Sequence, residues 1–177
     1  MTAVASPTGN DAASALRRLY LVRFGFAVVW AALLFVSRQE LGPLAITLLV
    51  LYPLFDVAAA VVDLRSSRNN GLYLNIAISL LAAAGLAIAT SAGIPAVLRV
   101  WGAWAIVSGL VQLAVAVGRR RMGGQWPMIL SGGISVLAGS SFIVMASGEN
   151  PTFANLAGYA TIGGIFFLVS ALRLRRS

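Results

Sequence analysis

The chain has 177 residues, of which 59% are hydrophobic and 10% are charged, and its formal net charge is +8. A soluble domain carries about 25% charged residues, so this composition indicates an integral membrane protein. Cysteine and histidine are both absent, which excludes disulfides, thiol nucleophiles, zinc–thiolate sites and histidine-based catalysis. The arginines flank apolar runs, so we expect the lipid bilayer and not nucleic acid to be their partner.

The order of the chain predicts a short tail and then a membrane domain. Residues 1–16 are small and polar and predict a disordered cytoplasmic tail, and residues 17–177 form the predicted domain. Six apolar runs lie at about residues 19–36, 43–62, 72–90, 96–117, 127–146 and 153–172. Each is close to the ~20 residues that cross a bilayer as a helix. The first run has full span length and no clean cleavage site, so we interpret it as an uncleaved signal anchor.

Arginine is distributed unequally between the two sets of helix ends. Ten arginines lie at one set of ends, whereas the other set carries Arg38 beside Glu40, and later Glu149. The positive-inside rule therefore predicts that both termini are cytoplasmic. Two clusters among the ten are candidate contacts for anionic lipid, although topology alone also accounts for them: Arg119, Arg120 and Arg121, and Arg173, Arg175 and Arg176. Trp126, at the start of its run, fits an aromatic anchor at the interface.

The six runs predict three tandem helical hairpins, at residues 19–65, 72–121 and 126–176. The second helices of the hairpins align without gaps at spacings of 52 and 55 residues. The alignment places together four sets of residues: Tyr52, Trp104 and Tyr159; Asp56, Ser108 and Gly163; Val57, Gly109 and Gly164; and Arg68, Arg120 and Arg175. Repeats of equal orientation imply a pseudo-threefold axis along the membrane normal. Two stripes of small residues predict close helix contacts: Ser79, Ala83, Ala87 and Ser91, and Ser131, Ser135 and Gly139.

This repeated unit resembles the short repeat of the HdeD-like acid-resistance membrane proteins over about residues 17–176. At the family's paired positions the chain has Arg23-Phe24-Gly25, Asp56-Val57, Ser108-Gly109 and Gly163-Gly164. The family's Arg-Gly pair is represented by Arg23 and Gly25, which are separated by one residue. Its Asp-Gly pair is represented by Asp56 and Val57, so the glycine is replaced by valine. The resemblance implies a bacterial inner-membrane protein linked to acid and envelope stress, with no settled biochemical activity and no cofactor.

Three charged residues, Arg23, Asp56 and Arg99, lie inside the predicted spans. Charge at membrane depth is costly and is therefore a candidate for function. Arg23 and Arg99 lie near opposite faces and could snorkel to the headgroups, and Arg99 could instead meet Glu149 or Glu40. Asp56 lies about 12 Å from the cytoplasmic boundary, so it must be paired, protonated or hydrated. We expect Arg23 and Asp56 to form an intramembrane ion pair.

Polar residues surround the predicted position of Asp56 in the cytoplasmic halves of neighbouring spans, namely Asn75, Ser79, Ser108, Gln112 and Ser131. They fit either interhelical hydrogen bonds that fix packing or a hydrated cavity for a small solute. No metal-ligand cluster, phosphate-binding glycine loop or nucleophile–base pair is present, so we do not expect an enzyme. We expect a structural or stress-tolerance role, and the alternative is a small transporter or channel for protons or a small solute that uses Asp56. Whether the chain forms a homo-oligomer is left open.

Overall fold

The computed structural model describes residues 9–65, 70–118 and 126–173, and it contains helices but no strand in those residues. A short 3₁₀ turn, η1 (Thr90–Ala92), joins the third helix to the fourth. The six α-helices are α1 (Gly9–Val36), α2 (Pro43–Leu64), α3 (Asn70–Ala89), α4 (Ile94–Gly118), α5 (Trp126–Met145) and α6 (Ala154–Arg173). α1 begins earlier than expected, so residues 9–16 are helical and not part of a disordered tail, and residues 1–8 lie outside the described part.

Five of these helices are long and apolar enough to cross a bilayer, and the protein is therefore a multi-pass α-helical membrane protein. The five segments are Ser14–Val36, Pro43–Leu64, Asn70–Ala92, Ile94–Ala114 and Ala154–Arg173. The apolar part of α5, Ile129–Met145, is shorter than these. Large apolar side chains on every helix face outward, as a hydrocarbon environment requires.

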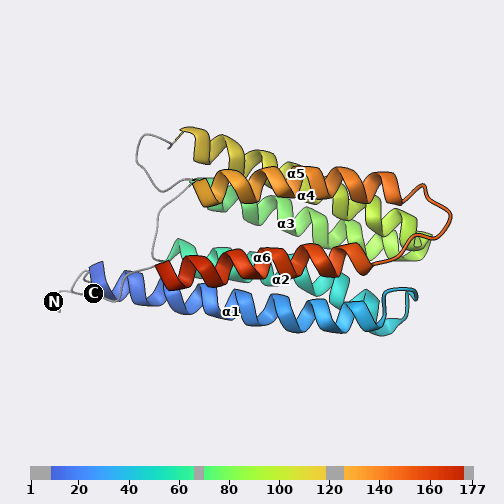
Figure 1. Cartoon of the computed structure of the whole chain (residues 1–177), viewed down its shortest axis with the longest axis horizontal. Helices are drawn as coiled ribbons and strands as arrows, with labels where there is room; N and C mark the ends of the chain where they lie inside the picture. The colour runs from blue at the N-terminus through green and yellow to red at the C-terminus, as the bar shows by residue number, and fades with distance from the viewer. Residues whose placement is uncertain (1–8, 66–69, 119–125, 174–177) are drawn as a thin grey trace.

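The helices alternate in direction and form one bundle, with the start of α1 and the end of α6 at the same end (Figure 1). Each helix contacts the next one in the chain, and α6 also packs on α1, so the six helices close into a ring. The most extensive contacts are α4 with α5, α1 with α6 and α2 with α3. The expected hairpin partners do touch, but the closest interfaces lie between hairpins.

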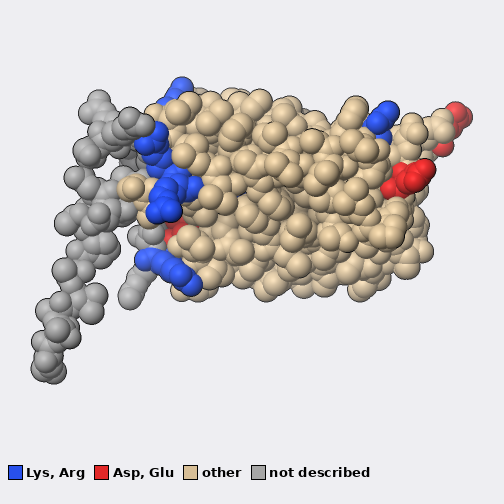
Figure 2. Space-filling model, turned by 90° about the horizontal axis from the view of Figure 1, so that it is seen from below, with Lys and Arg blue, Asp and Glu red and all other residues tan. Residues whose placement is uncertain are grey.

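Charged side chains gather at the two ends of the bundle and leave the middle of the visible face uncharged (Figure 2). One end, here called the arginine-rich end, holds Arg17, Arg18, Arg65 and Arg173. The opposite end holds Arg38, Glu40, Arg99 and Glu149. The other arginines expected at the arginine-rich end, among them Arg119, Arg120, Arg121, Arg175 and Arg176, lie outside the described residues.

The solid core occupies only the half of the bundle nearer the opposite end. Fully buried side chains there come from all six helices or the loops that lead into them, and they include Trp30, Leu49, Leu86, Trp101 and Phe142. The indole rings of Trp30 and Trp101 stack at 5.3 Å between centroids. The indole N–H of Trp30 also donates a 2.6 Å hydrogen bond to the carbonyl oxygen of Leu48, which ties α1 to α2. Dense packing of large rings closes this half.

Glycines bring α4 and α5 into backbone contact. A methyl group added at Gly102 would lie 2.5 Å from the carbonyl oxygen of Gly139. A methyl group added at Gly139 would likewise lie 2.5 Å from the carbonyl oxygen of Gly102. Two helical turns further along α4, a methyl group added at Gly109 would lie 2.7 Å from the carbonyl oxygen of Gly132. A methyl group added at Gly132 would lie 2.9 Å from the carbonyl oxygen of Gly109. Small residues allow this approach because lipid gives no hydrophobic drive to helix association. Glycine is therefore required at all four positions.

The two expected stripes of small residues are only partly buried. Ser79 and Ala83 are buried but Ala87 and Ser91 are exposed, so that prediction is wrong for the second half of the stripe. The reason is geometric, because a step of four residues overshoots a helical turn by about 40° and the stripe rotates out of the interface. In α5 the other stripe holds, since Ser135 and Gly139 are buried and Ser131 is half-buried.

Candidate functional site

A cavity of about 360 Å³ occupies the half of the bundle nearer the arginine-rich end. Residues of all six helices line it, and it extends from Asp63, Gly71 and Ser170 near the helix ends to Tyr52 and Trp104 at mid-bundle. There the aromatic rings of the solid core begin, with Tyr52 and Trp104 6.1 Å apart and Trp101 5.2 Å from Trp104. The cavity is partly open at one end and is floored by aromatic rings at the other.

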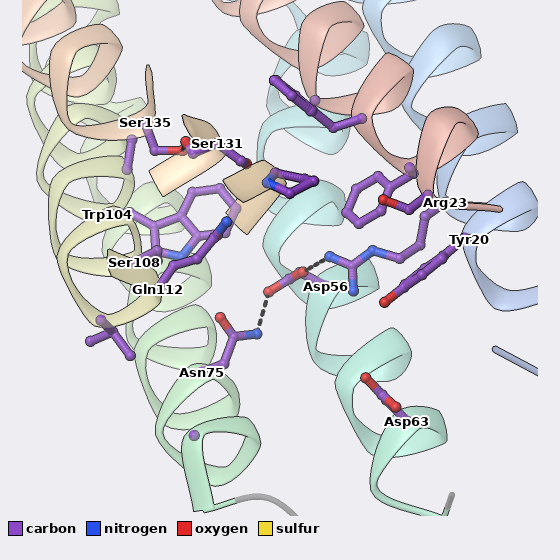
Figure 3. Close-up of a pocket in the computed structure, with 18 of the residues that line it drawn as sticks. Tyr20, Arg23, Asp56, Asp63, Asn75, Trp104, Ser108, Gln112, Ser131 and Ser135 are labelled. Atoms are coloured by element: carbon purple, nitrogen blue, oxygen red, sulfur yellow. Dashed lines mark hydrogen bonds and ion pairs between the residues drawn. The ribbon is translucent and has the colours of Figure 1, made fainter. Parts of the chain in front are cut away.

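Asp56 stands in the cavity wall and both of its carboxylate oxygens are hydrogen-bonded (Figure 3). Arg23 donates to Oδ1 through Nη2 and forms the expected ion pair across α1 and α2. Oδ2 accepts from the amide of Asn75 at 2.7 Å and from the hydroxyl of Ser79 at 2.9 Å, both on α3. Side-chain exposure is 20% for Arg23 and 12% for Asp56. Charge-assisted bonds of this kind offset the loss of hydration for the carboxylate.

Ser79 extends this network to a fourth helix. Its side chain is fully buried at 0% exposure, and its hydroxyl donates to Asp56 while it accepts the indole N–H of Trp104 at 3.3 Å. The hydroxyl is thus satisfied as donor and as acceptor. One carboxylate consequently links α1, α2 and α3 directly and α4 through a single serine.

A second hydrogen-bond network joins α5 to α6 across the cavity. The hydroxyl of Ser135 donates to the carbonyl oxygen of Ser131 at 2.9 Å and lies 2.8 Å from the hydroxyl of Tyr159. Because the serine proton is engaged by the carbonyl, the phenol is the donor in the second contact. By contrast, the hydroxyl of Ser108 is buried in the cavity wall without a hydrogen-bond partner among the described residues.

Arg23 is held from its other side by an aromatic ring. Its guanidinium carbon lies 4.3 Å from the centroid of the Phe167 ring on α6, and Tyr20 packs against the same phenylalanine at 5.9 Å. A guanidinium over a ring face gains a cation–π interaction that does not compete with the ion pair. Arg23 therefore reaches Asp56 in a fixed orientation and does not extend to the end of the bundle.

The remaining residues of the expected site fall into three groups. Ser108, Gln112 and Ser131 line the cavity and form part of its wall. Arg99 is exposed near the opposite end and makes no ion pair with Glu40 or Glu149 in the described residues, so of the two alternatives given for it the geometry fits the exposed one and not the ion pair. Trp126 at the start of α5 is 78% exposed, as an interfacial side chain would be.

Several contributors to the site were missed in the sequence. Phe167 and Tyr20 carry no signal of their own, since aromatic residues are common in membrane helices and only the fold brings them to Arg23. Asp63 also lines the cavity, between Asp56 and the arginine-rich end. Gly163 also lines the cavity, and a methyl group added there would meet nothing within 4 Å. Its alignment with Asp56 was the available clue that this position faces the same space.

The arrangement suits binding more than acid–base chemistry. Asp56 and Asp63 are seven residues apart, about 10 Å along the helix, so they do not share a proton. No group of three or more potential metal ligands occurs in the described residues. The walls instead combine aromatic rings, hydroxyls, amides and a neutralised ion pair, a mixture typical of ligand cavities.

Comparison of the chain with protein-family models, with curated proteins and with solved structures finds no match in any of the three.

Proposed function

We propose that the chain spans the bacterial inner membrane six times as three tandem hairpins, with both termini cytoplasmic and a pseudo-threefold axis along the membrane normal. α5 supplies the sixth span, because its charged flanks lie beyond a run that is only slightly short of the bilayer thickness. The arginine-rich end faces the cytoplasm, in agreement with the positive-inside rule.

Equivalent positions of the proposed repeat have equivalent surroundings. Burial is complete or nearly so at two sets of positions aligned at spacings of 52 and 55 residues: Leu49, Trp101 and Leu156; and Pro53, Ala105 and Ala160. The hydrogen bonds also recur. Trp104 donates to Ser79 in the second hairpin, and Tyr159 contacts Ser135 in the third, where the spacing from Ser79 to Ser135 is one residue longer than that from Trp104 to Tyr159. In the first hairpin the residue 52 positions before Ser79 is Ala27, which has no hydroxyl, so the bond has no counterpart.

We propose that the protein is non-enzymatic and acts in the structure and stress tolerance of the membrane, as the resemblance to HdeD-like proteins implies. The observation that carries this is the full saturation of Asp56 by Arg23, Asn75 and Ser79. A carboxylate that binds three donors on two other helices joins three helices. Such a group is suited to holding the bundle together.

Reconstitution tests this proposal. Purified protein in liposomes that enclose a pH-sensitive dye should give no proton flux above that of empty liposomes under an imposed pH gradient. Cells that lack the protein should lose viability in acid or after envelope damage, and wild-type protein should restore it. Protein-dependent proton flux that disappears in Asp56→Asn would contradict the structural function and support the alternative.

The alternative is a transporter for protons or a small solute, and the partly open cavity beside Asp56 is the observation that favours it. Transport would require a second conformation, because the rings of Trp30, Tyr52 and Trp101 fill the path to the opposite end. In that conformation the aromatic floor would separate and the arginine-rich end would close. A channel that conducts in the conformation described here is disfavoured by the same packing.

A further inference from the structure

We propose that the cavity binds a monovalent organic cation with an aromatic or apolar body, whose charged group lies beside Asp63. This site is independent of the structural role proposed above, since a ligand can occupy the cavity whether or not the bundle changes conformation. The proposal rests on the charge, the rings and the space of the cavity.

The described residues that line the cavity carry a net charge of minus one. Arg23, Asp56 and Asp63 are the charged residues among those that line it, and Arg23 neutralises Asp56. Asp63 makes no hydrogen bond or ion pair with any residue that the structure describes. Figure 3 places it between the Arg23–Asp56 pair and the arginine-rich end, facing the cavity. A partly buried carboxylate that has no hydrogen bond or ion pair within the described residues, and only the longer-range attraction of Arg23, favours a cation beside it.

The rings of the cavity wall suit the rest of such a ligand. Tyr20, Trp104, Tyr159 and Phe166 line the space, and Tyr52 closes its floor. Ring faces attract organic cations, and aromatic walls replace the water around an apolar body. Arg23 does not offer an equivalent site for an anion, because its guanidinium already pairs with Asp56 and stacks on Phe167.

The space is adequate and is created by a small residue. A volume of about 360 Å³ lies within the range of small-molecule pockets. Gly163, at the position equivalent to Asp56, leaves part of this volume empty because no atom lies within 4 Å of a methyl group added there. A ligand that enters with its apolar body first and keeps its charged group level with Asp63 would place that body towards Gly163, which is aligned with Asp56 about 10 Å deeper along the helix axis.

The described arginines at the same end do not reverse this preference. Arg17, Arg18, Arg65 and Arg173 are not among the residues that line the cavity. Their field is screened over about 8 Å at physiological salt, and anionic lipid headgroups neutralise it further. A free anion would be attracted by these arginines but would then be repelled by the carboxylate of Asp63 inside the cavity.

Titration calorimetry on the purified full-length protein in detergent, with three matched benzyl probes, tests the proposal. Benzyltrimethylammonium is the cation, benzenesulfonate the anion and benzyl alcohol the neutral control. We expect saturable binding of the cation alone. Asp63→Asn should weaken that binding about tenfold, the order of one partly screened charge contact, whereas the matched carboxylate Glu149→Gln at the opposite end should leave it unchanged.

A second pair of variants tests the position without removing charge. Gly163→Leu should fill the cavity and abolish binding, and Gly158→Leu should not, although a methyl group at either glycine meets no atom within 4 Å. Gly158 lies on the same helix but does not line the cavity. If Asp63→Asn does not fold, this pair still decides the question. Absence of cation binding, equal or tighter binding of benzenesulfonate, or cation binding that survives Gly163→Leu would each overturn the proposal.

Discussion

Removal of Asp56 or Arg23 alone should destabilise the bundle much more than the combined removal of both. Asp56→Leu leaves the guanidinium of Arg23 without its partner and also removes the acceptor of Asn75 and Ser79. Arg23→Leu leaves the carboxylate with two neutral donors only. Since both side chains are mostly buried, each single loss should cost about 3–5 kcal/mol.

The double variant Arg23→Leu/Asp56→Leu no longer contains an unpaired charge. What remains is the unsatisfied amide of Asn75, since Ser79 keeps Trp104 as a partner, and one such group costs about 1–3 kcal/mol. Independent effects would instead add to about 6–10 kcal/mol, so the coupling between the two sites should amount to several kcal/mol.

Thermal unfolding in detergent, followed by near-ultraviolet circular dichroism, measures this coupling. At about 2–4 °C per kcal/mol for a chain of this length, each single variant should melt roughly 6–20 °C lower and the double variant should recover much of the loss. Arg99→Leu and Glu40→Leu are matched controls, since both side chains are exposed and should change stability by less than about 0.5 kcal/mol. Additive losses in the double variant would refute the ion pair as the central cross-link.

The fold supports three further predictions. Gly139→Ala should destabilise by about 1–3 kcal/mol or more, because its methyl group would lie 2.5 Å from a backbone carbonyl of α4, whereas Gly133→Ala meets no atom within 4 Å and should be neutral or slightly stabilising in the same melting assay. The chain has no cysteine, so Glu149→Cys should react with an impermeant maleimide from outside intact cells and Arg65→Cys should not; the reverse pattern would invert the orientation. Ser135→Ala removes the hydroxyl contact to α6 and should cost about 1 kcal/mol, and an unchanged melting temperature would show that this network adds no stability.

The elements and the ion pair could be predicted because the bilayer leaves few alternatives. A run of about 20 apolar residues in lipid has to be a helix, so the six helices follow from composition and spacing. The pairing of Arg23 with Asp56 followed from depth, because two residues on neighbouring helices about 6 Å apart along the axis were each otherwise left as an unpaired charge. Asn75 and Ser79 followed in the same way as polar groups at matching depth.

The division of the bundle into a solid half and a hollow half could not be predicted. It depends on which rings meet from distant segments, such as Trp30 with Trp101, and on contacts of Arg23 with Phe167 that span almost the whole chain. Side-chain volume at non-local contacts has no periodic signature. For the same reason the sequence indicated hairpins but not that the closest interfaces would lie between them, where Gly102 and Gly139 allow backbone contact.

The asymmetry of the proposed repeat explains where the cavity lies. The aligned positions Asp56, Ser108 and Gly163 face one space, and they decrease in size and polarity from the first hairpin to the third. A symmetric bundle with aspartate at all three positions would place three carboxylates near one axis, at a cost that lipid could not offset. With one charge, one hydroxyl and one glycine, the first hairpin carries the ionic cross-link and the third leaves room. The same substitution pattern that allows the charge to be paired therefore creates the space for a ligand beside it.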